Sequence, residues 1–248
     1  MSKKGLPSIS HPMLSIELPL SKAKVQFRPF TVREQQVLVL AQQSEDIDSI
    51  YASISNVLSS CTNNTIDLES TSLCDLSYLF LQMYIASNGS DITLKTVCSN
   101  EECKHDILMR FDLTEVGIST PVDRKIQLTT DVGMILRYPT YKDTLELAKV
   151  KNDPEAAIFL LVESIYDSDS VYEKSDYTLD EFREWFVSMS ADQLQKVYNF
   201  VDKIPDISYN LKYHCPKCKK QYSKPLEDLQ TFFRLGAQSK LDRGVLQD

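Results

Sequence analysis

Two short stretches with paired cysteines decide the fold of this chain: T-V-C-S-N-E-E-C-K-H at residues 96–105 and Y-H-C-P-K-C-K-K at residues 213–220. Each cysteine pair lies between two strand-like runs, and the second pair has the C-x2-C spacing of a zinc knuckle. Together the pairs supply four thiolates, the number that a closed tetrahedral Zn²⁺ site requires. The sequence therefore predicts one structural zinc ion, with the ligands Cys98, Cys103, Cys215 and Cys218.

A site of this kind would stabilise the fold and perform no chemistry. Four protein ligands leave no position open for water or substrate. Thiolates also repel one another, so four of them converge only when a dication compensates their charge. Cys98 and Cys215 lie 117 positions apart. By analogy with a covalent cross-link, closing so long a loop is worth about 4–5 kcal/mol.

Other readings of these cysteines stay open at this stage. C-P-K-C is similar to the C-P-x-C of glutaredoxin-type redox sites, which place the first cysteine at a helix N-terminus after a strand. Here Pro225 stops any helix soon after the motif, and no βαβ pattern surrounds it. His105 and His214 flank the two pairs and are alternative ligands. The cysteines could also pack without a metal, as we expect for Cys61 and Cys74 on apolar helix faces.

The composition excludes several classes of function. The chain has 248 residues, 42% of them hydrophobic and 25% charged, which is ordinary for a globular protein. Only six glycines are present, and there is no G-x-G-x-x-G or G-K-[ST] motif for phosphate binding. No Ser/His/Asp order, H-E-x-x-H motif or Cys/His dyad suggests catalysis. We therefore expect no enzyme. With no apolar run of membrane-spanning length and no signal peptide, we expect a cytosolic protein.

The charge of the chain is unevenly distributed. The net charge of −8 argues against broad nucleic-acid binding. Residues 203–248, however, hold nine Lys or Arg against five Asp or Glu. The lysines around the second cysteine pair either offset the negative charge of a zinc–thiolate centre or form a docking patch for an acidic partner. They are Lys212, Lys217, Lys219, Lys220 and Lys224.

The N-terminal part predicts a hairpin followed by helices. Residues 15–18 and 24–27 alternate polar and apolar, as half-buried strands do. Thr31 and Glu34 have the spacing of a capping box at the start of a helix. Two further helices are predicted at residues 46–61 and 73–86. The last is apolar on most sides and should lie centrally, and Asn88-Gly89 should end it.

The remaining patterns predict strands around the cysteine pairs and helices between them. Antiparallel strands are expected at residues 92–97 and 106–111, at 125–128 and 134–138, and at 207–213. Helices are expected at residues 144–151, 155–166, 178–188, 190–201 and 226–233, and an exposed loop at 167–175.

These elements predict an α+β fold with a mainly helical core, antiparallel hairpins and a two-knuckle, zinc-ribbon-like β region. A doubly wound parallel sheet is not expected, because the strands follow one another across short turns. We expect one domain at residues 1–235 and a polar C-terminal tail at 236–248. The parts of the domain are the hairpin 13–30, the helical core 31–88 and 141–203, and the zinc-knuckle region 91–113 plus 207–226.

Three further motifs give the chain a family resemblance. They are F-R-P-F-T-V-R-E at residues 27–34, D-L-S-Y-L-F-L at residues 75–81, and C-P-K-C followed by the apolar series Leu226, Leu229, Phe232 and Phe233. In this order they resemble the T-even-type phage baseplate hub assembly proteins, up to about residue 235. Two features depart from that pattern: the wider spacing of Cys98 and Cys103, and Lys219 where a knuckle commonly has glycine.

The resemblance implies a non-enzymatic role as a hub assembly factor or chaperone, or as a hub subunit. It implies hub proteins as partners, without nucleic acid, and a location in the host cytoplasm or in the virion tail baseplate. The alternative function is a zinc-ribbon nucleic-acid-binding protein that uses the lysines of the second knuckle.

Overall fold

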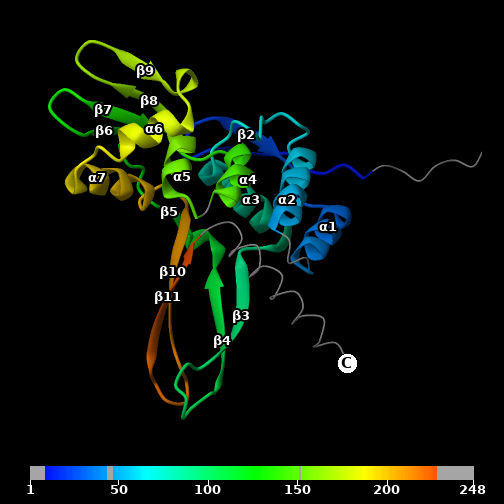
Figure 1. Ribbon diagram of the computed structural model, residues 1–248. Helices are drawn as coiled ribbons and strands as arrows, with labels where there is room; N and C mark the ends of the chain where they lie inside the picture. Colours follow the sequence, from blue (N-terminus) through cyan, green and yellow to red (C-terminus); the bar gives the residue numbers. More distant parts are fainter. Residues whose placement is uncertain (1–8, 44–46, 151, 228–248) are drawn as a thin grey trace, which may run out of the picture.

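The computed structural model describes residues 9–43, 47–150 and 152–227. Helices and small antiparallel sheets form a body, and two long hairpins extend from it as an arm (Figure 1). Every strand pair within the described residues is antiparallel. The predicted α+β class is thereby confirmed.

The N-terminal half of the body packs a hairpin against three helices. The hairpin consists of β1 (Leu14–Glu17) and β2 (Lys24–Phe27), as predicted. The helices are α1 (Val32–Gln43), α2 (Ile47–Cys61) and α3 (Leu73–Asn88). Helix α3 is buried on several sides and ends at Gly89, whose φ of 84° suits a residue without a side chain.

A buried carboxylate attaches the hairpin to α3. Asp75 is 1% exposed and accepts hydrogen bonds from the backbone N–H groups of Leu20 (2.8 Å) and Ser21 (3.0 Å). These two donors belong to the turn between β1 and β2. The carboxylate replaces the water molecules to which these N–H groups would otherwise donate. The first residue of D-L-S-Y-L-F-L therefore has a structural role.

The arm consists of two hairpins that are distant in sequence. The first pairs β3 (Asp91–Val97) with β4 (Asp106–Asp112), and the second pairs β10 (Ile207–His214) with β11 (Gln221–Glu227). The short strand β5 (Gly117–Ile118), after the 3-10 turn Leu113–Glu115, extends the second hairpin. The inward faces of both hairpins share one apolar cluster, which includes Leu94, Ile107, Met109, Leu211 and Leu226.

The other half of the body contains a four-stranded antiparallel sheet in the order β6-β7-β8-β9. Its strands are β6 (Lys125–Gln127), β7 (Gly133–Leu136), β8 (Val162–Tyr166) and β9 (Val171–Glu173). The helices are α4 (Tyr141–Lys149), α5 (Pro154–Leu161), α6 (Leu179–Phe186) and α7 (Ala191–Val201), and a 3-10 turn spans Lys174–Asp176. Phe182, Phe186, Val197 and Phe200 of α6 and α7 belong to the same apolar cluster as Met134 and Leu136 of the sheet.

Three sequence predictions were wrong. The helix expected at 155–166 ends at Leu161, because V-E-S-I-Y alternates its side chains and pairs with β7 as strand β8. The loop expected at 167–175 contains strand β9. The helix expected at 226–233 is wrong at its start, where β11 continues to Glu227, and its remainder lies outside the described residues. The tail predicted at 236–248 also lies outside them.

Candidate metal centre

The far end of the arm brings the four paired cysteines together. The β3–β4 turn holds Cys98 and Cys103, and the β10–β11 turn holds Cys215 and Cys218. The Sγ atoms of Cys98 and Cys218 are 3.6 Å apart, and those of Cys103 and Cys215 are 3.8 Å apart. All four sulfurs lie within 4.8 Å of one another.

This arrangement fits a tetrahedral metal ion. Zn–S bonds of about 2.3 Å in a regular tetrahedron place neighbouring sulfurs about 3.8 Å apart. The pairs Cys98–Cys218 and Cys103–Cys215 have that spacing. The donor set is all thiolate, which suits a soft or borderline cation. The geometry is compatible with a metal site, and the assignment of the four residues as ligands stays a prediction.

The two turns have similar backbones in spite of their different cysteine spacing. The N–H of Cys98 donates to the carbonyl of His105 (2.8 Å), and the N–H of Cys215 donates to that of Lys220 (2.9 Å). The residue after the second cysteine is left-handed in both turns, with φ of 41° at Lys104 and 62° at Lys219. The sequence offered the cue at position 219, where a knuckle commonly has glycine.

A tyrosine that the sequence analysis did not single out lies beside the sulfurs. The hydroxyl of Tyr222 is 3.0 Å from Cys98 Sγ. This hydrogen bond lowers the pKa of Cys98 to about 6 and raises the pKa of Tyr222 to about 12, so the phenol donates to the thiolate. Burial raises the pKa of Cys103 to about 11. The protein alone therefore favours a thiolate at Cys98 over one at Cys103, and a bound cation would favour ionisation of Cys103 as well.

The remaining sulfur and imidazole groups lie outside this cluster. His105 and His214 are exposed and are not among the four clustered residues. Cys61 and Cys74 are buried in the helical body, as expected, and burial raises the pKa of their thiols to about 11 and about 12. C-P-K-C leads into strand β11 instead of a helix, so it lacks the helix N-terminus of a glutaredoxin-type site.

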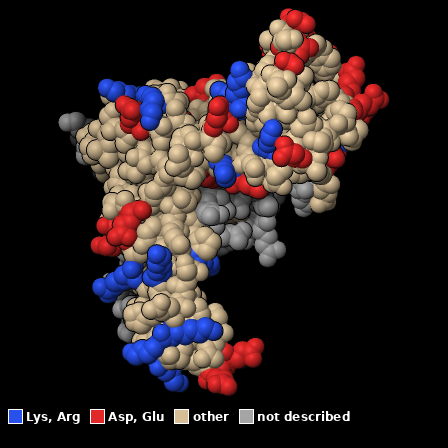
Figure 2. Space-filling view, turned by 90° about the vertical axis from the view of Figure 1, so that its left-hand side faces the viewer, with Lys and Arg blue, Asp and Glu red and all other residues tan. Residues whose placement is uncertain are grey.

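The second hairpin of the arm is strongly basic. Residues 207–226, which we call the basic hairpin, contain five lysines and no Asp or Glu. All five lysine side chains are exposed. Figure 2 shows several basic side chains close together on the arm, which forms the lower part of that view. Because the whole chain has a net charge of −8, the rest of it carries −13.

Comparison with known proteins identifies the family. Residues 11–234 match the family described as T4 bacteriophage base plate protein. No curated protein and no solved structure shows significant similarity to the chain. Among the helices that the structure describes, none has the length and apolarity needed to cross a membrane. Membership makes this a protein of the phage tail baseplate and implies contacts with other baseplate proteins. Since the match covers most of its length, the chain belongs to the T4 bacteriophage base plate protein family.

Proposed function

We propose that this protein helps to assemble the central hub of the phage tail baseplate, as an assembly chaperone or as a hub subunit. It acts through protein–protein contacts and performs no catalysis. Assembly takes place in the host cytoplasm, where the protein meets its hub partners. The family match supports a baseplate role, and the arm supports the proposed mode of action.

The arm is the single observation that carries this proposal. It extends from the body (Figure 1), so a partner can reach both of its hairpins. The outer face of the first hairpin exposes two apolar side chains, Val97 (53% exposed) and Leu108 (65% exposed). The basic hairpin adds five exposed lysines. Exposed apolar side chains and a charged surface on the same arm suit an acidic protein partner, because charge steers the encounter and apolar contact holds it.

A zinc ion at the four cysteines fits this proposal as a structural group. Cys98, Cys103, Cys215 and Cys218 would hold it, and it would join the two hairpin ends into one rigid contact surface. The metal region is then zinc-ribbon-like in the sense that two β turns share one ion. We also propose that residues 1–235 fold as one domain, because the arm needs strands from both sides of residues 113–206.

The stacked tyrosines of the basic hairpin favour a second candidate function, nucleic-acid binding. Tyr213 and Tyr222 lie with their ring centroids 5.2 Å apart, and the Lys220 ammonium lies 5.8 Å from the Tyr222 centroid. Lysines beside aromatic rings are typical of single-strand binding surfaces. The charge of −13 on the rest of the chain opposes this reading, since it repels phosphates.

An affinity purification from infected cells tests both functions. The tagged protein is recovered separately from the particle fraction and from free protein. The arm variant combines Lys212→Glu, Lys217→Glu and Lys220→Glu, and the control combines Lys142→Glu and Lys203→Glu on the exposed body surface. We expect hub proteins with the wild type and the control, and their loss from the arm variant.

Two outcomes would contradict the proposal. If the arm variant recovered as much hub protein as the wild type, the arm would not be part of the contact. Recovery of salt-sensitive DNA or RNA, without structural proteins, would favour the nucleic-acid function.

A further inference from the structure

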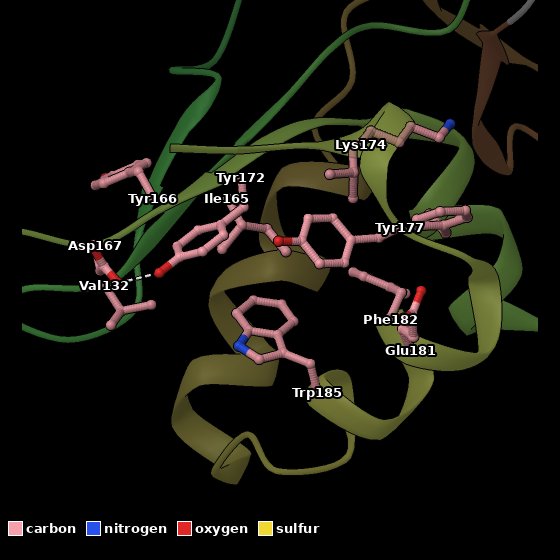
Figure 3. A pocket seen from close by; sticks show the side chains of 12 residues that line it. Val132, Ile165, Tyr166, Asp167, Tyr172, Lys174, Tyr177, Glu181, Phe182 and Trp185 are labelled. Carbon is pink, nitrogen blue, oxygen red and sulfur yellow. Dashed lines mark hydrogen bonds between the residues drawn. The ribbon is translucent and has the colours of Figure 1, made fainter. Parts of the chain in front are cut away.

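An aromatic pocket lies in the other half of the body, between the sheet and α6. Its volume is about 420 Å³. Figure 3 shows that side chains from β8, β9 and α6 line it. Six rings and two carboxylates are among the groups that line it: Phe159, Tyr166, Tyr172, Tyr177, Phe182, Trp185, Asp167 and Glu181. No residue of the arm lines this pocket.

The rings form connected walls with free polar edges. The centroids of Tyr172 and Tyr177 are 6.3 Å apart, and those of Phe182 and Trp185 are 5.9 Å apart. Tyr177 is 42% exposed. Within the part of the chain that the structure describes, neither the Trp185 indole N–H nor the Tyr177 hydroxyl forms a hydrogen bond. The pocket therefore offers ring faces together with two polar groups that a ligand can use.

The surroundings of the pocket are acidic. Residues 163–184 contain eight Asp or Glu against two basic residues, Lys174 and Arg183. Asp167 accepts a hydrogen bond from Tyr172 (2.7 Å), and one oxygen of Glu181 accepts from the Thr178 backbone (2.8 Å). These bonds hold both carboxylates at the edge of the pocket while they keep their negative charge.

Lys174, the one lysine that lines the pocket, already has interaction partners. Its ammonium lies 4.9 Å from the Phe159 ring centroid and donates to the Leu160 carbonyl (3.0 Å). Figure 3 shows the amino group of Lys174 turned away from Trp185. It therefore leaves the space between Tyr172, Tyr177 and Trp185 free of positive charge.

Ring faces and carboxylates together select a planar cation. Aromatic faces are electron-rich, and a guanidinium stacks on them while it hydrogen-bonds in its own plane. An aliphatic side chain would also pack on the rings, but it would make no use of the negative charge of the two carboxylates. Arginine is also among the residues most common at energetic centres of protein interfaces. We infer that this pocket binds an arginine side chain presented by a partner protein. The inference depends neither on the metal nor on a role in the hub.

The chain contains its own reporter for this site. Trp185 is the only tryptophan, so intrinsic fluorescence monitors the pocket. The probes are Ac-Gly-Arg-Gly-NH₂ and the same peptide with citrulline, lysine or leucine in place of arginine. Citrulline has almost the shape of arginine and no charge. We expect a saturable change with the arginine peptide and an affinity about tenfold weaker with citrulline or leucine, the loss typical of one exposed cation–π and ion-pair contact.

Two matched variants test whether the carboxylate of Glu181 contributes to binding of the arginine peptide. Glu181→Gln removes the charge and keeps the capping box with Thr178, because glutamine also serves at that position. Glu184→Gln removes an exposed carboxylate of the same helix that does not line the pocket. We expect the arginine peptide to bind several-fold more weakly to Glu181→Gln and unchanged to Glu184→Gln, with circular dichroism confirming that both fold.

Other outcomes would overturn the inference. Equal weakening by the two variants would mean that the peptide responds to net charge alone. Equal affinity for the leucine or citrulline peptide would make the pocket an apolar docking site. A lack of saturation up to the solubility limit of the arginine peptide would remove the site altogether.

Discussion

Glu34 and Asp143 occupy equivalent positions in two copies of one arrangement. Each carboxylate pairs with an arginine six residues earlier, Arg28 or Arg137, with one N···O distance of 2.8 Å in both cases. Each also accepts a hydrogen bond of 2.8 Å from the backbone N–H of the residue three positions earlier, Thr31 or Thr140.

The shared sequence pattern is R-x2-T-x2-[DE], at residues 28–34 and 137–143. Each copy connects an antiparallel hairpin to a helix, β1–β2 to α1 and β6–β7 to α4. Both carboxylates are buried, at 6% and 5% exposure. The block F-R-P-F-T-V-R-E thus has a physical role, because its arginine and glutamate fix the entry angle of α1.

Replacing Glu34 with glutamine should destabilise the protein by roughly 2–4 kcal/mol, because Arg28 would keep a half-buried charge without its partner. Urea unfolding followed by circular dichroism measures this change. The control is Glu146→Gln, which breaks an exposed pair with Lys149 and should cost less than about 0.5 kcal/mol. Equal losses in the two variants would contradict the role given to the Arg28–Glu34 pair.

The stabilisation from Glu34 should depend on pH. Burial opposes its ionisation, but the hydrogen bonds from Arg28 and Thr31 outweigh it and hold the pKa of Glu34 well below the usual range. A depressed pKa stabilises the fold above the unfolded value of about 4.3, and this contribution is lost as the pH falls toward the folded pKa. The stability difference between wild type and Glu34→Gln should therefore be constant from pH 7 to 5 and shrink below about pH 4. A difference independent of pH would rule this out.

Elemental analysis should find one zinc ion per chain, and the ion should be absent from Cys215→Ser. Loss of the ion should expose the amides of the arm to hydrogen exchange, because a metal held by the four cysteines would join the two hairpin ends. Cys74→Ser is the control, since Cys74 lies in α3 and outside the cluster. Retention of zinc by Cys215→Ser, or no metal in the wild type, would disprove the assignment of the ligands.

Tyr222→Phe should weaken zinc binding about 10–100-fold, the range typical of groups that hydrogen-bond to a metal ligand. The variant removes only the hydroxyl that lies 3.0 Å from Cys98 Sγ. Competition with a colorimetric chelator measures the affinity. Tyr213→Phe keeps the stacked ring pair intact and should bind zinc like the wild type. If both variants behaved alike, the hydrogen bond would have no role at the metal.

Lys219→Gly should stabilise the protein by about 1 kcal/mol, because glycine adopts a φ of 62° without steric cost. Lys220→Gly is the matched control, since Lys220 is not in the left-handed region and should gain nothing. The midpoint of thermal unfolding of the zinc-loaded protein compares the two. A larger gain at position 220 would show that the charge, and not the backbone, decides the effect.

Segments whose apolar residues follow a single period, that of a helix or that of a strand, were predicted correctly. Segments that are compatible with both periods were not. Residues 15–27 and 47–61 each have a single period, and both formed the predicted element. Residues 155–166 satisfy a helical pattern throughout, yet their last five residues form β8, because strand β7 offers them backbone partners. The aromatic pocket was missed for the same reason, since Tyr166 and Tyr172 were assigned to a helix and to a loop.

The sequence predicted only the part of the candidate site that follows from the spacing of its cysteines. Four cysteines in two pairs are a local signal, and the structure brings all four together. Tyr222 approaches Cys98 through the pairing of β10 with β11 and the packing of the two hairpins, which no local pattern contains. The repeat of R-x2-T-x2-[DE] is present in the sequence, but its structural role became clear only from the positions of the two buried carboxylates.

The construction of the arm from two distant hairpins also sets an order of events during synthesis. The strands β3 and β4 leave the ribosome roughly one hundred residues before β10 and β11. Until then Cys98 and Cys103 have no partner cysteines and the inner face of the first hairpin is uncovered. A nascent chain interrupted between residues 112 and 207 therefore has the first hairpin with two of the four clustered cysteines and lacks the second hairpin. Only chains translated through both hairpins complete the arm and its cluster of four cysteines.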